Sequence, residues 1–184
     1  ALRPGAEVLE RHAAHAAGCA FVKDTAMAPA PQRYDIVVTT NSGYPLDLNL
    51  YQAVKGMSAA AQVVKQGGAI ICAAECWDGI PDHGLYGQLL RDAATPADLL
   101  ATIMAPGFLA QDQWQAQIQA QIQLRAAVYV YAEYLSDEQL RNALLLPCRD
   151  IAVTIAELRR HYGPDTTICV LPEGPQTIPF VRTH

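Results

Sequence analysis

The sequence predicts an α/β fold, with a doubly wound, mostly parallel sheet and helices on both of its faces. Two observations lead to this prediction. Short β-branched and apolar runs, typical of buried parallel strands, alternate with stretches in which apolar residues recur every three or four positions, as they do on helices. The connections between them are short, so strand, helix and next strand form βαβ units, which have parallel strands and right-handed crossovers.

The N-terminal part contains two expected helices and two expected strands. Glu7–Val22 is rich in alanine and predicts a helix, and Pro29–Pro31 interrupts whatever follows it. Asp35–Thr40 predicts a buried strand that ends in the turn-forming cluster Asn41–Pro45.

Asp47 is then expected to cap a long helix. The apolar stripe of that helix comprises Leu50, Val54, Met57, Ala61 and Val64. We expect Gly67-Gly68 to stop the helix, and Ala69–Ala74 to form the next buried strand.

The middle of the chain holds the one ambiguous element. Leu85–Ala93 and Pro96–Met104 predict short helices. In Gln113–Leu124 glutamines alternate with apolar residues, a period typical of strands. Glutamine and alanine favour helices and disfavour strands, so we predict a helix there. Ala127–Tyr131 predicts a third strand.

The C-terminal part completes the alternation. Ser136 and Gln139 form a capping-box signature that opens a helix, and Leu144–Leu146 predicts a short fourth strand. Thr167–Leu171 predicts the last strand. Between them a helix carries the stripe Ile151, Ile155, Leu158 and Tyr162. The whole pattern predicts a single Rossmann-like three-layer domain without internal repeats.

Composition excludes several classes of protein. The 184 residues are sufficient for one core, and the net charge is −5 with scattered basic residues, which argues against a nucleic-acid surface. No stretch approaches the length of a membrane span. The five cysteines are an odd number in mostly apolar contexts, which favours free core thiols in a reducing cytoplasm. We therefore expect a cytoplasmic protein.

The first strand delivers its turn to the edge of the sheet where parallel α/β sheets bind ligands. Tyr51, Gln52 and Lys55 follow in the first turns of the helix, where Tyr51 and Gln52 can both neighbour Lys55. A hydroxyl, a carboxamide and an ammonium near a positive helix end suit a small anion such as a carboxylate. The alternative is that Lys55 is a solvated surface lysine, and the pattern alone leaves both open.

The range Asp35–Met57 closely resembles the signature of the C-terminal domain of the nickel-pincer-nucleotide-dependent lactate racemase family. The resemblance continues at Gly67–Ile71, Asp112–Gln115 and Pro172–Pro175, so it covers nearly the whole chain. A contiguous match of this length is far more specific than a short motif.

The resemblance implies a set of substrate-binding residues. Lys55 matches an anchor for the substrate carboxylate, Gln52 and Tyr51 match supporting residues, and Trp114 matches a wall of the pocket. It also implies racemisation or epimerisation of a 2-hydroxy acid by hydride transfer to a nickel-pincer nucleotide. In that family the cofactor and the catalytic histidines belong to the N-terminal domain, so this chain is expected to supply no catalytic residue, hold no metal and be inactive alone.

The expected organisation is a linking helix and loop over 1–33 and one C-terminal α/β domain over 34–184, whose partner is its own N-terminal domain. His12 and His15 share a helix face, but no third ligand accompanies them, so surface histidines are favoured. The loop Glu75–Gly84 differs from the sequence expected of the family at this place, which points to a substrate other than lactate among the 2-hydroxy acids. Its Trp77 and His83 fit either a substrate pocket or a domain interface. The alternative function is a self-contained α/β module that binds a small anion without catalysis.

Overall fold

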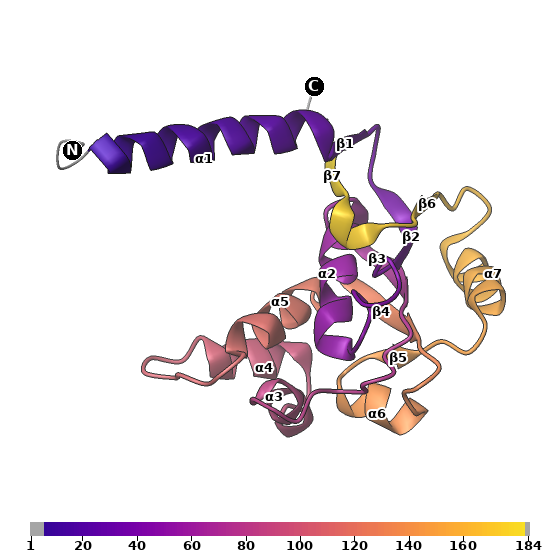
Figure 1. Cartoon of the computed structure of the whole chain (residues 1–184). Helices are drawn as coiled ribbons and strands as arrows, with labels where there is room; N and C mark the ends of the chain where they lie inside the picture. Colours follow the sequence, from indigo (N-terminus) through magenta and orange to yellow (C-terminus); the bar gives the residue numbers. More distant parts are fainter. Residues whose placement is uncertain (1–5, 183–184) are drawn as a thin grey trace.

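The computed structural model describes residues 6–182 and contains the predicted parallel sheet (Figure 1). All strand pairs in this five-stranded sheet are parallel, in the order β5-β4-β3-β2-β6. Its strands are β2 (Tyr34–Thr40), β3 (Val64–Ala73), β4 (Ala126–Tyr131), β5 (Leu146–Pro147) and β6 (Ile168–Leu171). The chain moves outward from β2 to β5 and then returns to the other side of β2. The sheet is therefore doubly wound, as predicted, with its switch point between β2 and β6.

The two faces of the sheet are covered unequally. Figure 1 shows one group of helices on one side of the sheet and α7 on the other. The first group comprises α2 (Leu50–Ala61), α3 (Tyr86–Asp92), α4 (Pro96–Ile103) and α5 (Gln113–Gln123). The second face carries α7 (Ile151–Tyr162), while the short α6 (Asp137–Asn142) lies by β5.

Strand alternation divides the core into two clusters. Val37, Ile70 and Val128 belong to the large cluster under α2 and α5. Ile36 and Ile71 belong to a small cluster with Leu158 of α7. Successive side chains on a strand point to opposite faces, so one strand supplies both clusters. The site lies on the side of the larger cluster.

The boundary between α2 and β3 differs from the prediction. The helix ends at Ala61, and Val64 starts β3 by pairing with Tyr34 instead of extending the apolar stripe of the helix. Gly67 and Gly68 therefore lie within the strand. A side chain at Gly68 would approach the Asp35 carbonyl oxygen to 2.7 Å, where the register shifts. Gly68 therefore serves the close approach of two backbones, and Gly67 beside it adopts a positive φ of 75°, so neither glycine stops the helix.

The helical prediction for the glutamine-rich segment is confirmed as α5. Gln115 and Gln119 are buried and donate to the carbonyl oxygens of Tyr51 and Ala143 at 2.6 and 2.8 Å. Gln123, one turn further on, donates to the Leu144 carbonyl oxygen. Spacing of four places the three amides on one face of the helix. Gln119 and Gln123 satisfy backbone carbonyls of the turn after α6 that apolar side chains would leave unpaired, and Gln115 ties α5 to the first turn of α2.

One other prediction is partly corrected near the C-terminal end. The capping box of Ser136 and Gln139 is confirmed at the start of α6. The expected strand at Leu144–Leu146 begins only at Leu146, because Leu144 adopts a positive φ of 62° in the turn that leaves α6. The predicted helix with the Ile151 stripe and the last strand are both present.

A second, two-stranded sheet was not predicted. β1 (Met27–Ala30) pairs in parallel with β7 (Ile178–Val181), and the helix α1 (Ala6–Thr25) precedes it. Pro29 was expected to interrupt structure. In β1 it is accommodated because a strand with one partner has a side on which no amide donor is required. The first five residues of the predicted linking segment lie outside the described residues. Among the helices from α1 to α7, none has both the length and the apolar character of a membrane span.

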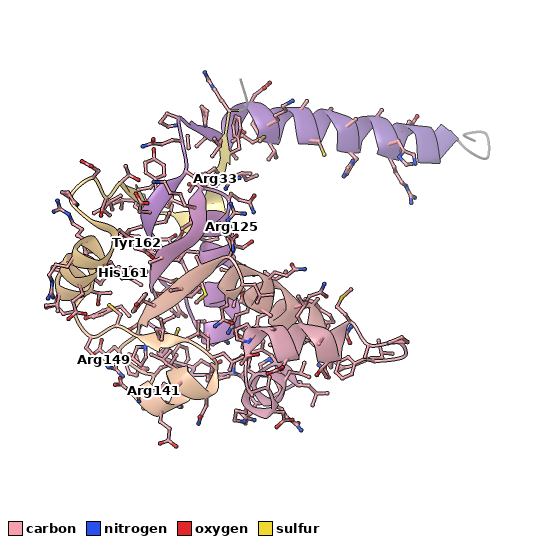
Figure 2. The ribbon with its side chains drawn as sticks, turned by 180° about the vertical axis from the view of Figure 1, so that it is seen from behind. Arg33, Arg125, Arg141, Arg149, His161 and Tyr162 are labelled. Atoms are coloured by element: carbon pink, nitrogen blue, oxygen red, sulfur yellow. The ribbon has the colours of Figure 1, made fainter. Side chains whose placement is uncertain are left out.

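Polar side chains form hydrogen bonds with the backbone at the edge of the main sheet where its strands begin. Arg33 and Arg125 both donate to the Val64 carbonyl oxygen, and Tyr162 donates to that of Gly67 at 3.0 Å (Figure 2). Asp35 accepts from the amide and hydroxyl of Thr167 at 2.9 and 2.6 Å, which ties β2 to the start of β6. This edge is therefore closed by side chains, and the open edge lies at the other end.

Candidate functional site

The start of α2 lies at the carboxyl edge of the sheet and is capped differently from the prediction. Asn49, and not Asp47, is the N-cap, and its Oδ1 accepts from the Gln52 amide at 3.2 Å. The Gly79 carbonyl oxygen accepts from the Leu50 amide at 3.0 Å. Two of the helix's first free donors are thus taken by protein groups. An anion at this site must be held mainly by side chains.

The buried carboxylate of Asp47 joins two loops of this edge. Its Oδ2 accepts from the Glu75 amide at 2.9 Å, and its carbonyl oxygen accepts from the Cys76 amide at 3.0 Å. The loops that follow β2 and β3 are therefore held together beside α2. This role explains why an acidic residue stands two positions before the helix cap.

Two glycines allow α2 to lie directly on the end of β2. A side chain at Gly56 would approach the Thr40 carbonyl oxygen to 2.5 Å, and one at Gly174 would approach it to 2.6 Å. Asn41 fixes the contact, because its Oδ1 accepts from the Gly56 amide at 2.9 Å. Lys55, the residue before Gly56, is consequently held close to the switch point.

Two of the four predicted site residues form one hydrogen-bonded pair on α2. Lys55 Nζ donates to Gln52 Oε1 at 2.5 Å, and the Lys55 side chain is exposed. Within the described chain, no carboxylate forms an ion pair with Lys55. The ammonium has two further donors for an added acceptor. The arrangement thus presents a positioned cation to an anionic ligand.

The other two predicted residues form a second pair beside the first. Trp114 Nε1 donates to Tyr51 Oη at 3.0 Å. The Tyr51 ring packs edge-to-face on Tyr86 with centroids 5.3 Å apart, and Trp114 remains 53% exposed. Tyr51 thus contacts α5 through Trp114 and α3 through Tyr86. Tyr51 therefore orients the indole of Trp114.

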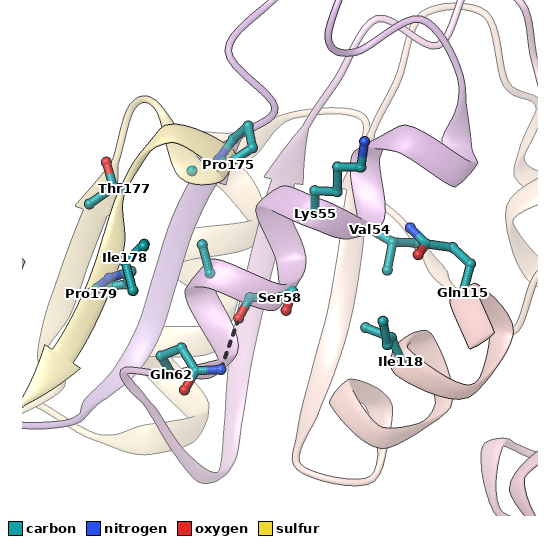
Figure 3. Close-up of a pocket in the computed structure, with 12 residues that line it drawn as sticks. Val54, Lys55, Ser58, Gln62, Gln115, Ile118, Pro175, Thr177, Ile178 and Pro179 are labelled. Carbon is teal, nitrogen blue, oxygen red and sulfur yellow. Dashed lines mark hydrogen bonds between the residues drawn. The ribbon is translucent and has the colours of Figure 1, made fainter. Parts of the chain in front are cut away.

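A groove runs from Lys55 along α2 and was not anticipated from the sequence (Figure 3). It encloses about 360 Å³ between α2, α5 and the segment that joins the 3₁₀ turn η1 (Gly174–Gln176) to β7. Its lining residues are Val54, Lys55, Ser58, Ala59, Gln62, Gln115, Ile118, Gly174, Pro175, Thr177, Ile178 and Pro179. In the sequence, only the resemblance at Pro172–Pro175 indicated a functional role for any part of this lining. The lining residues of α2 and α5 look like an ordinary helix surface in the sequence.

The loop after β3 leaves Trp77 half-exposed, at 50%, on the same edge. Cys72 and Cys76 are buried there, and burial raises the pKa of both thiols, that of Cys76 to about 12. They remain protonated near neutral pH and therefore act as core residues, as predicted. All five cysteines are free, but Cys19 is exposed.

Metal ligands are not gathered anywhere in the described part of the chain. Between residues 6 and 182, no three His, Cys, Asp or Glu side chains are grouped so that they could hold a metal ion. His15 contacts Cys19 Sγ at 3.8 Å on the exposed helix α1. The described residues thus do not by themselves fit a nickel centre.

Comparisons with known proteins identify relatives of this arrangement. The family described as the lactate racemase C-terminal domain matches residues 30–178. Lactate racemases of Thermoanaerobacterium thermosaccharolyticum and Lactiplantibacillus plantarum are 36% and 35% identical over 90% of this chain. The chain spans 39% of the length of each of these curated relatives.

Solved structures agree with the sequence relatives. The lactate racemase apoprotein of T. thermosaccharolyticum superposes with a TM-score of 0.82 at 35% identity, over 92% of this chain and 40% of that one. A Thermotoga maritima protein gives 0.61 at 11% identity, over 92% and 42%. The second likeness concerns the fold alone.

Proposed function

The chain belongs to the lactate racemase family, and from this premise we propose that it is the substrate-closing domain of a 2-hydroxy acid racemase or epimerase. In this role it binds the substrate carboxylate on Lys55 and shields the reacting carbon from water. It supplies no proton donor or acceptor to that carbon. A 2-hydroxy acid shares the carboxylate of lactate, the compound named in the relatives' titles.

One observation carries this proposal: Lys55 is a positioned ammonium with which no carboxylate among residues 6–182 forms an ion pair. Gln52 holds Nζ at 2.5 Å, and the close packing at Gly56 holds the helix that carries both. An exposed lysine that merely solvates a surface needs no such support. A carboxylate reaching Nζ would form a charge-assisted hydrogen bond that strengthens when the cleft closes.

Trp114 supports the same role as a wall of the pocket. Tyr51 holds its indole nitrogen, and Gln115 anchors the following turn of α5 to the Tyr51 carbonyl oxygen. An indole fixed in this way presents a rigid apolar face next to Tyr51, on the same edge as Lys55. Trp77, at 50% exposure on the neighbouring loop, adds apolar surface to the edge that a partner domain would cover.

We propose the domain organisation on the same basis. Residues 1–33 link to an N-terminal domain, and residues 34–184 form the C-terminal domain. A nickel-pincer nucleotide, as hydride acceptor, would be held by the N-terminal domain, because the described residues of this chain do not gather metal ligands. The contribution of this chain is then limited to binding and orienting the substrate and to closing the cleft.

The decisive test is Lys55→Ala in the full-length protein, assayed for racemisation of several 2-hydroxy acids. Removing one partner of a buried charge pair costs about 2–5 kcal/mol, so kcat/KM should fall at least roughly thirtyfold. Lys55→Arg should retain only part of the wild-type kcat/KM, because the planar guanidinium group does not place its charge where the compact lysine ammonium does. Gln52→Ala should lower kcat/KM less, because it removes a neutral group.

Arg159→Ala is the matched control, because it removes an exposed cation from α7 on the other face of the sheet. It should leave kcat/KM unchanged. Wild-type turnover by Lys55→Ala would contradict the assignment of Lys55. Carboxylate binding without any turnover by the full-length wild type would instead favour the non-catalytic anion-binding module.

A further inference from the structure

The groove beside Lys55 is larger than a lactate molecule needs. It encloses about 360 Å³, within the range of about 300–1,000 Å³ for sites that bind drug-sized ligands. The substituent on C2 of lactate is a single methyl group. A ligand that ended there would leave most of the groove unused, so the groove has room for a longer substituent.

The walls of this groove are mainly apolar. Val54 and Ala59 of α2, Ile118 of α5, Pro175 of η1 and Ile178 of β7 form the apolar lining. Figure 3 shows α2 between Ile118 and Ile178. These walls come from segments far apart in the sequence, and Asp and Glu are absent from the lining. Apolar surface of this kind gains free energy when it removes a hydrocarbon chain from water.

The polar residues of the lining are Lys55, Ser58, Gln62, Gln115 and Thr177, and Gln115 and Thr177 already donate to the carbonyl oxygens of Tyr51 and Glu173. Lys55 lines the groove with its stem, while its Nζ reaches back one turn to Gln52. At the far end, Gln62 Nε2 donates to the Ser58 carbonyl oxygen at 3.5 Å, so its amide already has a partner. From Lys55 to Gln62 the helix rises by about 10 Å, which sets the length available to a ligand.

We infer that the groove binds the side chain of an aliphatic 2-hydroxy acid several carbons longer than lactate, with its carboxylate on the Lys55 ammonium at the Gln52 end and its chain along the Lys55 stem. This inference rests on the proposed function, because it names the substrate class of the same site. Ala59 and Ile118 then determine chain-length specificity. A substrate with a charged side chain is disfavoured, because a carboxylate inside the groove would lose water without gaining a partner.

The test measures binding of acetate, butanoate and hexanoate to the 184-residue chain by heteronuclear NMR titration. These probes carry the carboxylate and the chain but need no turnover. Burial of one methylene contributes about 0.8 kcal/mol, so affinity should rise roughly fourfold per methylene and on the order of a hundredfold from acetate to hexanoate. The amides of Ser58 and Ile118 should shift with hexanoate. Equal affinities for the three acids would overturn the inference.

Two variants fill or remove a wall of the groove. Ala59→Leu should reduce the affinity of hexanoate to that of acetate, because leucine occupies the space of the chain. Ile118→Ala, at a position 37% exposed, should lower hexanoate affinity by roughly tenfold and provides the test if Ala59→Leu does not fold. Ala156→Leu on the exposed side of α7 is the matched control and should preserve the whole series.

Lys55→Ala separates the anchor from the groove, because it should weaken all three acids. Undiminished hexanoate binding in that variant would overturn the placement of the carboxylate. If the chain-length series holds but the full-length protein racemises no 2-hydroxy acid, the proposed function fails and the groove assignment stands. If lactate is racemised without any preference for longer acids, the proposed function stands and this inference fails.

Discussion

The two faces of the five-stranded sheet differ in how completely they are covered. On the first face α2 and α5 enclose a large apolar cluster, and buried glutamines pair with the backbone between elements. On the second face α7 contributes only Leu158 as a buried residue, and a cavity of about 360 Å³ separates part of it from β4. All four candidate substrate-binding residues belong to the first face. A binding site needs side chains held in one geometry, and dense packing supplies that rigidity.

The largest expected difference is between core truncations on the two faces. Met57→Ala should lower the free energy of unfolding by about 4 kcal/mol, because Met57 is fully enclosed and leaves a cavity. Leu158→Ala should lower it by about 2 kcal/mol, because Leu158 is 7% exposed beside an existing cavity. Urea unfolding measures both values. Equal losses of unfolding free energy would contradict the conclusion that the first face is packed more densely than the second.

The glutamine face of α5 provides the next test. Gln119→Leu should lower the free energy of unfolding by about 2–4 kcal/mol, since it leaves the Tyr86 hydroxyl and the Ala143 carbonyl oxygen buried and unpaired. Gln121→Leu, on the exposed side of the same helix, is the matched control and should change it by less than about 0.5 kcal/mol. Adding Tyr86→Phe to Gln119→Leu should recover part of the loss. No recovery would mean that the unpaired hydroxyl is not the cause.

The smallest effect concerns the strand that follows α7. Partial burial raises the pKa of Asp35, but hydrogen bonds from Lys65 and Thr167 outweigh it and lower the pKa to about 2 from an ordinary 3.8. A carboxyl group with a lowered folded-state pKa stabilises the fold above its unfolded pKa and loses that contribution as pH falls toward the folded value. The Asp35 contribution is therefore complete above about pH 4 and is lost between about pH 4 and pH 2.

Asp35→Asn should accordingly lower the free energy of unfolding by about 1–2 kcal/mol at pH 6, a value reduced by the solvent exposure of Lys65. The gap between variant and wild type should narrow when urea unfolding is repeated near pH 2.5. A gap that stays constant with pH would show that geometry, and not the charge of Asp35, holds β6 to β2.

The fold class was predictable from local patterns. A buried parallel strand is a short β-branched run, and an amphipathic helix repeats every three or four residues, so β2, β4 and α7 could be identified without tertiary information. The helix α5 was predicted from the helix preference of glutamine and alanine, against the period of its pattern. The residues Tyr51, Gln52, Lys55 and Trp114 were named from the resemblance. The sequence alone placed the first three on one short stretch of helix.

Tertiary structure decided what depends on contacts between distant segments. Val64 leaves the stripe of α2 because it pairs with Tyr34, and β1 forms only because β7, about 150 residues later, lies beside it. Asn49 replaces Asp47 as the helix cap because the loop after β3 occupies the Asp47 carboxylate. The groove has the same origin, because its walls come from α2, α5 and the segment before β7. Local sequence determines which element a residue joins, whereas a cavity exists only where separate elements meet.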